Sequence, residues 1–210
     1  MNRLLIILLI YVWCNSGYAS DKEYYDYLIN LNVPQSNALI QALSSDDQSM
    51  VLAAIQRIGD IRLTNAKKHI WNCMAQVNPE ANQGKSIDDK QHEIMLKSIQ
   101  TIGRIADDSD VRDIVVYLKA VNKSDHESLR AIYHSLGEIA GSTNAIQALN
   151  QLTMSVRDER DANELLSSIL KQNSKTSASF LAIMSDVDSF SSGFKKLLKD
   201  SAMSLAKDGD

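Results

Sequence analysis

The sequence contains little cysteine, proline or glycine. Of its 210 residues, two are cysteine, two are proline and eight are glycine. Scarce proline leaves helices uninterrupted, and no long stretch alternates apolar and polar side chains with the period of two that is typical of strands. The composition therefore predicts an all-α protein.

An excess of basic residues is also lacking. The net charge is −4, aromatic residues make up 6% of the chain, and they are not interleaved with lysine or arginine. The electrostatic attraction that dominates nucleic-acid binding is thus missing, and so is a stacking platform for single strands. The sequence predicts no nucleic-acid partner.

The longest apolar run, residues 4–13, is short and follows Arg3. A membrane-spanning helix needs about 20 residues, so the run favours a signal peptide over an uncleaved anchor. Small residues at Gly17 and Ala19 suit a signal peptidase. We expect residues 1–19 to be a signal peptide cleaved after Ala19, which predicts a periplasmic or secreted protein without stable membrane insertion.

The two cysteines have different expected fates. A lipid attached at Cys14 is an alternative to cleavage after Ala19, but the bulky Trp13 stands where lipoprotein sites carry a small residue. Cleavage removes Cys14 and leaves Cys73, so no internal disulfide can form. Loss of Arg3 with the signal peptide changes the net charge from −4 to −5.

A short phrase occurs three times, at residues 54–61, 98–105 and 131–139. Each copy is an apolar helical stripe that leads into a glycine, a charged residue and isoleucine. Because glycine enters the left-handed cap conformation without a Cβ penalty, we expect Gly59, Gly103 and Gly137 each to end a helix. Three helix ends of similar sequence in one chain predict stacked repeats.

The spacing of the glycines supports this interpretation. The interval from Gly103 to Gly137 is about 34 residues, a normal length for a two-helix repeat, whereas the interval from Gly59 to Gly103 is longer. The surplus falls in a polar segment, residues 78–86, which we expect to be an inserted loop. A second helix follows each glycine and has an apolar face for the core. The residues at this face are Ile70, Trp71 and Met74, then Val111, Ile114, Val115 and Leu118, then Ala145, Ala148, Leu149 and Leu152.

Residues 39–60 carry a family resemblance. Four features follow one another in this segment: a helix that ends in Ala-Leu at Ala42, an acidic turn at Asp46, a helix with an Ala-Ala pair at Ala53, and a helix end Ile-Gly-Asp at Asp60. This order resembles the HEAT-like repeats of the phycobiliprotein-lyase type, over residues 39–152. The resemblance implies an α-solenoid of stacked antiparallel helix pairs (an armadillo/HEAT-type right-handed superhelix).

The sequence also departs from that family pattern. Leu52 and Leu96 stand where such repeats usually have arginine, so we expect no ladder of Asp–Arg pairs along the turns. A fourth copy has Leu170 and Lys171 in place of Leu-Gly, which suggests that the array is ending. We therefore expect one domain at 20–210, with N-terminal helices at 20–47, repeats at 48–172 and capping helices at 173–210. A docking helix for a partner is the alternative for the last segment.

Motifs for reaction chemistry fail on inspection. Residues 84–86 match the end of the phosphate-binding loop motif, but Pro79 stands where the motif has its first glycine. Asp186 could open a calcium loop, but Ser191 and Leu197 replace the required glycine and glutamate. These mismatches predict no cofactor.

Two pairs that each include a histidine remain as candidates, one for a metal site and one for a catalytic thiol. His134 and Glu138 are four residues apart and could offer two metal ligands, although a helix-surface pair is favoured because zinc needs more ligands. Cys73 lies four residues after His69, so a catalytic thiol with a base is conceivable; an unpaired cysteine is more often a small buried apolar residue. We therefore predict no catalytic residue and no metal site.

We expect the second helices to line an inner, concave surface. Positions ten and thirteen residues after each glycine should face outward there, and they are His69, Asn72, Asp113, Val116, Gln147 and Asn150. This polar row suits a protein partner or an extended peptide, and residues 78–86 are the other candidate for binding. The sequence thus predicts an exported, non-enzymatic adaptor or scaffold. The alternatives are a lyase- or isomerase-like enzyme that uses Cys73 and His69, or a purely structural envelope component.

Overall fold

The computed structural model describes residues 35–76 and 88–209, and within them every regular element is helical. The predicted all-α class is confirmed. The predicted signal peptide, Cys14 and the predicted loop at 78–86 lie outside the described residues. The described α-helices are α3 (Gln35–Ala42), α4 (Gln48–Asp60), α5 (Lys67–Gln76), α6 (Asp89–Ile105), α7 (Val111–Ala120), α8 (His126–Glu138), α9 (Thr143–Leu152), α10 (Glu159–Gln172), α11 (Ala178–Met184) and α12 (Ser192–Asp208).

Side-chain caps fix where most of the longer helices begin. The carboxylates of Asp47, Asp88, Asp125 and Asp158 accept hydrogen bonds from free backbone N–H groups in the first turns of α4, α6, α8 and α10. The Ser191 hydroxyl does the same for α12. Aspartate and serine are strong N-caps because they satisfy donors that have no partner inside the helix. Short 3₁₀ turns, η1 (Thr64–Ala66), η2 (Asp108–Asp110) and η3 (Lys175–Ser177), lead into α5, α7 and α11.

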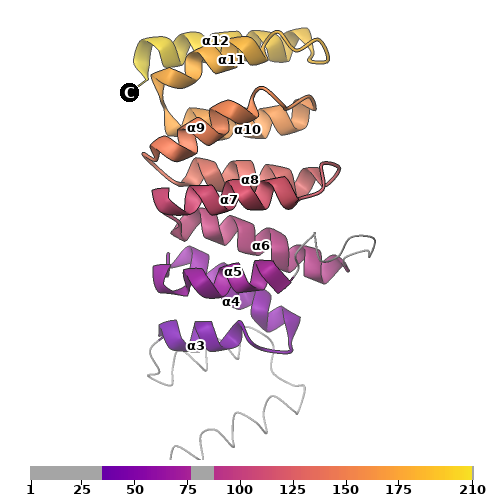
Figure 1. Ribbon diagram of the computed structural model, residues 1–210, viewed down its shortest axis with the longest axis vertical. Coiled ribbons are helices and arrows are strands. Elements are labelled where there is room, and N and C mark those ends of the chain that lie inside the picture. The colour runs from indigo at the N-terminus through magenta and orange to yellow at the C-terminus, as the bar shows by residue number, and fades with distance from the viewer. Residues whose placement is uncertain (1–34, 77–87, 210) are drawn as a thin grey trace, which may run out of the picture.

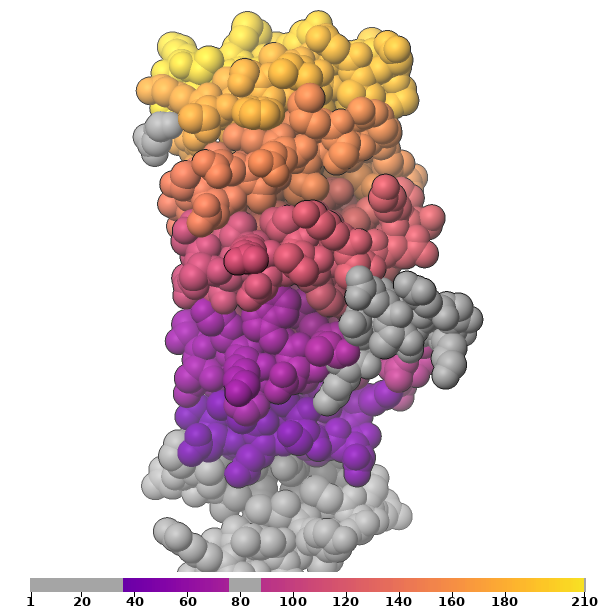
Figure 2. Space-filling view, in the orientation of Figure 1, coloured from indigo at the N-terminus to yellow at the C-terminus, as the bar shows by residue number. Residues whose placement is uncertain are grey.

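The helices form two layers along one long axis (Figure 1). A long-helix layer contains α4, α6, α8, α10 and α12, and a short-helix layer contains α3, α5, α7, α9 and α11. Each short helix packs on the long helix that follows it, as α5 does on α6 and α11 on α12. Segments succeed one another along the axis in chain order (Figure 2).

Most of the apolar side chains predicted for the core lie between the layers. Ile70, Met74, Val111, Ile114, Ala145 and Leu149 are all buried, and Trp71, Val115, Leu118, Ala148 and Leu152 are partly buried against them. The predicted faces of α5, α7 and α9 are confirmed. Among the described helices, none is long and apolar enough to cross a membrane.

The three repeated glycines do not end their helices. Gly59, Gly103 and Gly137 lie within the last turns of α4, α6 and α8, and among the described glycines only Gly141 has a positive φ. The prediction of left-handed caps was therefore wrong. Glycine is required at two of these positions because another helix comes too close for a side chain.

Close approach occurs where each long helix crosses the next. A Cβ atom at Gly103 would lie 2.5 Å from the Ser135 Cα atom, and one at Gly137 would lie 2.8 Å from the Ser168 Cβ atom. Neither distance is possible without a shift of the backbone. Hydroxyl groups bridge two of the crossings: Thr101 donates to the Ile55 carbonyl, and Ser135 donates to the Ile99 carbonyl at 2.7 Å.

The stack loosens after α10. The sequence pattern places Lys171 at the glycine position, but in the structure Leu170 stands there, because it follows Ser168 by two residues as Gly137 follows Ser135. Beyond this point α12 packs on α10 much less closely than α10 packs on α8. Glu159 still joins the two helices, because its carboxylate accepts hydrogen bonds from the backbone N–H and hydroxyl of Ser191.

Candidate functional site

An open groove of about 450 Å³ crosses three successive long helices. It is the larger of two pockets in the described part of the chain that we considered as sites. Its lining is Leu96, Gln100 and Arg104 from α6, Glu127, Arg130, Ala131 and His134 from α8, and Glu164 from α10. Most of these side chains are polar or charged, so the groove suits a hydrated ligand or a peptide better than an apolar molecule.

The groove belongs to the long-helix layer, whereas the sequence pointed to the helices that follow the glycines. Neighbouring long helices touch along their length, but α5 and α7 make few contacts with each other. The short-helix layer is thus the more widely spaced side of the stack. This spacing favours the long helices, and not the short helices, as the inner layer.

The predicted row on the short helices is exposed at five of six positions. His69, Asn72, Asp113, Val116 and Gln147 are exposed, but they do not line the groove. Asn150 is only 4% exposed, and its side-chain oxygen has no hydrogen-bond partner in the described structure. The expectation that Asn150 offers contact surface was therefore wrong.

The border of the core face on the short helices explains the error at Asn150. On α5 the buried residues include Ile70 and Cys73, and Asn72 between them is exposed. On α9 the buried residues include Leu149 and Asn150, although Asn150 stands at the same offset from Gly137 as Asn72 does from Gly59. A constant offset from the glycine therefore finds the core side of each short helix but does not fix the exposure of the residues at its border.

A row of side chains on α8 faces α10, and two of its members, Arg130 and His134, line the groove. His126, Arg130 and His134 are spaced by four residues, so they lie along one side of the helix. Nδ1 of His126 is 2.6 Å from Oδ2 of Asp161, and Nη1 of Arg130 is 3.4 Å from Oδ1 of the same carboxylate. The hydrogen bond to Asp161 and its negative charge raise the pKa of His126 above its usual value.

His134 contacts two carboxylates with its two ring nitrogens. Nε2 is 3.4 Å from Glu138 on its own helix, and Nδ1 is 3.3 Å from Glu164 on α10. The predicted helix-surface pair of His134 with Glu138 is confirmed.

Charges of alternating sign run along one edge of the long-helix layer, next to the groove. The residues directly after the three glycines are Asp60, Arg104 and Glu138, and Lys171 has the corresponding place on α10. Arg104 is 2.8 Å from Asp60, and Lys171 is paired with Glu138. These two acid–base pairs join α4 to α6 and α8 to α10; a single Asp–Arg pair is not a ladder along the turns, so the expectation of no such ladder is not contradicted.

Cys73 and His69 do not form an activated pair. Cys73 is 5% exposed, while His69 is exposed on the same helix. Burial raises the pKa of the Cys73 thiol, whereas a nucleophilic cysteine requires a lowered one. The thiol is placed as a small apolar core residue.

One group of potential metal ligands adjoins the row on α8. Donor atoms of His126, Asp158 and Asp161 lie within 4.8 Å of one another. However, Asp158 already caps α10 by accepting hydrogen bonds from two backbone N–H groups, and Arg130 places its positive charge beside Asp161. Because protein groups already satisfy these carboxylates, we assign no metal to them.

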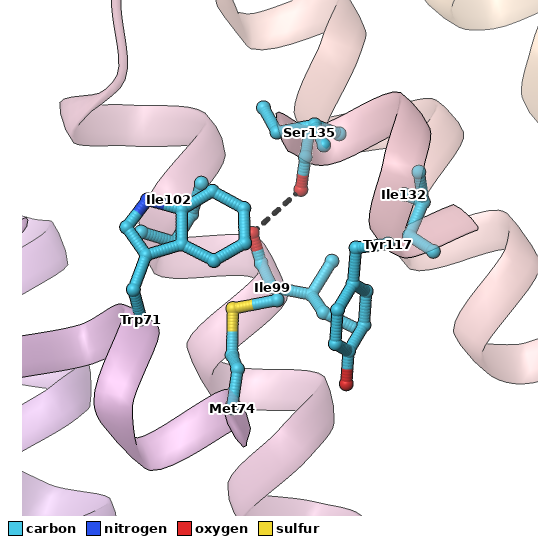
Figure 3. A pocket seen from close by; sticks show the side chains of 8 residues that line it. Trp71, Met74, Ile99, Ile102, Tyr117, Ile132 and Ser135 are labelled. Carbon is cyan, nitrogen blue, oxygen red and sulfur yellow. Dashed lines mark hydrogen bonds between the residues drawn. The ribbon is translucent and has the colours of Figure 1, made fainter. Parts of the chain in front are cut away.

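The other pocket is an apolar gap of about 10 Å³ between α5, α6, α7 and α8. Its lining includes Trp71, Met74, Ile102 and Tyr117, and in Figure 3 the Tyr117 hydroxyl points away from the other side chains drawn. Such a volume is about the minimum for one water molecule. The gap is a packing imperfection of the core and no ligand site.

Comparisons with known proteins give no further guide to the site. A scan against protein-family models found no family that matches the chain, and a search of curated proteins found no matching relative. The likeness to HEAT-like repeats thus rests on the residues quoted above.

Sequence reasoning missed the residues that line the groove. The signal was present, since Gln100, Arg104, Arg130 and His134 include two pairs spaced by four, one on each of two successive long helices. The repeated glycines suggest that the helices after them form the binding surface. The long helices, which contain the glycines, are then assigned to the core. Nothing in the sequence shows that the other side of the long helices remains open.

Proposed function

We propose that the chain is a non-enzymatic protein-binding scaffold of the armadillo/HEAT type, an α-solenoid that holds an extended segment of a partner protein along its long-helix layer. The observation that carries the proposal is the groove over α6, α8 and α10. It lies on three consecutive levels of the stack, as an extended ligand requires. The regular close packing of successive long helices supports the solenoid part of the proposal.

Polar side chains along the groove suit a peptide backbone. Gln100 and His134 stand four residues before Arg104 and Glu138, and Gln56 has the same place relative to Asp60 on α4. An amide side chain can both donate to a peptide carbonyl and accept from a peptide N–H. Packed helices are about 8–10 Å apart, which matches about three residues of extended chain at about 3.3 Å each.

The matched glutamines on the two layers test the location of the site. Linear peptides that bind the full chain would be selected from a random library. Their affinity for the full chain would then be compared with their affinity for each variant. We expect Gln100→Ala to weaken the selected peptides about tenfold, because a buried peptide group loses its partner. Gln147→Ala removes the same side chain from the short-helix layer and should leave binding unchanged. If Gln147→Ala weakens binding and Gln100→Ala does not, the peptide lies on the short helices.

Export of the protein remains part of the proposal. Arg3, the apolar run at 4–13 and the small residues Gly17 and Ala19 support a cleaved signal peptide. We expect the chain recovered from its native host to begin at Ser20, as N-terminal sequencing would determine. Ala19→Arg should block cleavage because the peptidase requires a small residue there. A mature chain that begins at Met1, or a lipid on Cys14, would contradict the proposal.

A further inference from the structure

A charged cluster of α8 and α10 adjoins the groove. His126 and Arg130 of α8 face Asp161 of α10, and of these three residues Arg130 also lines the groove. With a neutral imidazole the three groups have a net charge of 0, and with His126 protonated the net charge is +1. Histidine is the side chain that makes this change between about pH 5 and 8.

Other charged groups stand near His126. Asp158 and Arg160 lie at the start of α10, and Asp125, which caps α8, is 3.2 Å from His92 of α6. α7 and α9 also pack on α8 but contribute no residue to the groove. Protonation of His126 therefore acts on a ligand in the groove through Arg130, which lines the groove and shares Asp161 with His126.

One carboxylate is shared by a histidine and an arginine. The side chain of Asp161 is 5% exposed, and its two oxygens face His126 Nδ1 at 2.6 Å and Arg130 Nη1 at 3.4 Å. An imidazolium at the shorter distance neutralises the carboxylate. When His126 loses its proton, Asp161 keeps its full charge and Arg130 becomes its remaining cationic partner.

We propose that the groove binds the carboxylates of an extended acidic peptide through Arg130, and that protonation of His126 switches this binding on below neutral pH. The inference rests on the proposed function and names the partner class and its control. Protonated His126 satisfies Asp161 and releases Arg130 toward the ligand. Arg130 can then hold a peptide carboxylate firmly, since charge-assisted hydrogen bonds to carboxylates are the strong ones.

The raised pKa of His126 supports the switch, because it extends the protonated form toward neutral pH. Arg130 is also suited to its role by its geometry. Its guanidinium has five N–H donors, and its contact with Asp161 at 3.4 Å is long for a hydrogen bond. A peptide carboxylate could form two shorter bonds to the same side chain.

A labelled hexaglutamate peptide tests the inference on the full chain. Its affinity would be measured by fluorescence anisotropy at pH 6 and pH 8, in low salt so that screening does not hide the effect. We expect binding to be about tenfold tighter at pH 6, a change equal to about 1.4 kcal/mol. Hexaglutamine and hexalysine peptides serve as neutral and basic comparisons. At pH 6 both should bind more weakly than hexaglutamate does.

Three variants separate the roles of the side chains. Arg130→Gln should weaken hexaglutamate at both pH values, because it removes the contacting guanidinium. His126→Ala should also bind weakly at both, since Asp161 then holds Arg130 whatever the pH. His69→Ala removes an exposed histidine of α5, outside the groove, and should keep the tenfold difference. Circular dichroism would confirm that each variant is folded.

The inference is overturned by equal affinity at both pH values, by a preference for hexalysine, or by a His126→Ala variant that keeps the pH effect. These outcomes do not depend on the glutamine test. If selected peptides are neutral and lose affinity with Gln100→Ala, the scaffold proposal stands and the acidic partner is wrong. If hexaglutamate binds as expected but Gln100→Ala has no effect on the selected peptides, the charge switch stands and the backbone contact is wrong.

Discussion

Alanine at Gly103 will lower the free energy of unfolding by about 3 kcal/mol, at the upper end of the usual cost of overpacking. The added Cβ would lie 2.5 Å from the Ser135 Cα and 2.9 Å from its carbonyl oxygen. These are backbone atoms, so α6 and α8 must move apart and lose the contacts around them. Alanine favours a helix over glycine by about 1 kcal/mol, and this gain is too small to offset the clash.

Gly193 provides the matched control. It lies in the first turn of α12, and a Cβ there would meet no atom within 4 Å. Gly193→Ala should therefore leave stability unchanged or raise it by up to about 1 kcal/mol. Urea denaturation of the two variants would measure the difference. Equal effects at both positions would show that α6 and α8 do not cross closely.

Ile102→Ala should have a comparable cost, about 2–5 kcal/mol. Ile102 is 1% exposed and lines the small apolar gap between α5, α6, α7 and α8. Shortening the side chain removes apolar contacts and enlarges a gap that is already present. Its cost follows from lost packing, unlike the clash expected at Gly103.

The control for Ile102 is Ile183 of α11, which is 50% exposed. Ile183→Ala deletes the same atoms from the surface and should change the free energy of unfolding by less than about 0.5 kcal/mol. Thermal or urea denaturation would compare the two. A small effect at Ile102 would mean that the face of α6 assigned to the core is wrongly phased.

The positions of the helices could be predicted because the information is local. An apolar residue every three or four positions marks one face of a helix, and it identified the cores of α5, α7 and α9. Acidic and serine caps mark the beginnings in the same way, as Asp47 does for α4. These signals need no knowledge of the neighbouring helices.

The role of the glycines could not be predicted from local signals. A glycine in the last turn of a helix and a glycine just after it look alike in a sequence. Gly103 is needed because of Ser135, which is distant in the sequence and belongs to the next long helix. The register between those two helices decides the role, and the sequence of one helix does not contain it.

The prediction of the binding residues was wrong for a related reason. The six predicted positions were chosen by a constant offset from the glycines, but this offset does not fix the exposure of residues at the border of the core side, so Asn150 is buried while Asn72 is exposed. The groove residues were visible as pairs spaced by four. Which side of the long helices stays open depends on how the two layers pack, and that is a property of the assembled stack.

The alternating charges of Asp60, Arg104, Glu138 and Lys171 restrict how such a chain could grow by duplication. Copying one helix pair in tandem would set two residues of the same sign side by side along this edge. Copying two adjacent pairs would preserve the alternation. Each exposed pair contributes only about 0–1 kcal/mol, so the preference for adding or removing helix pairs two at a time would be weak.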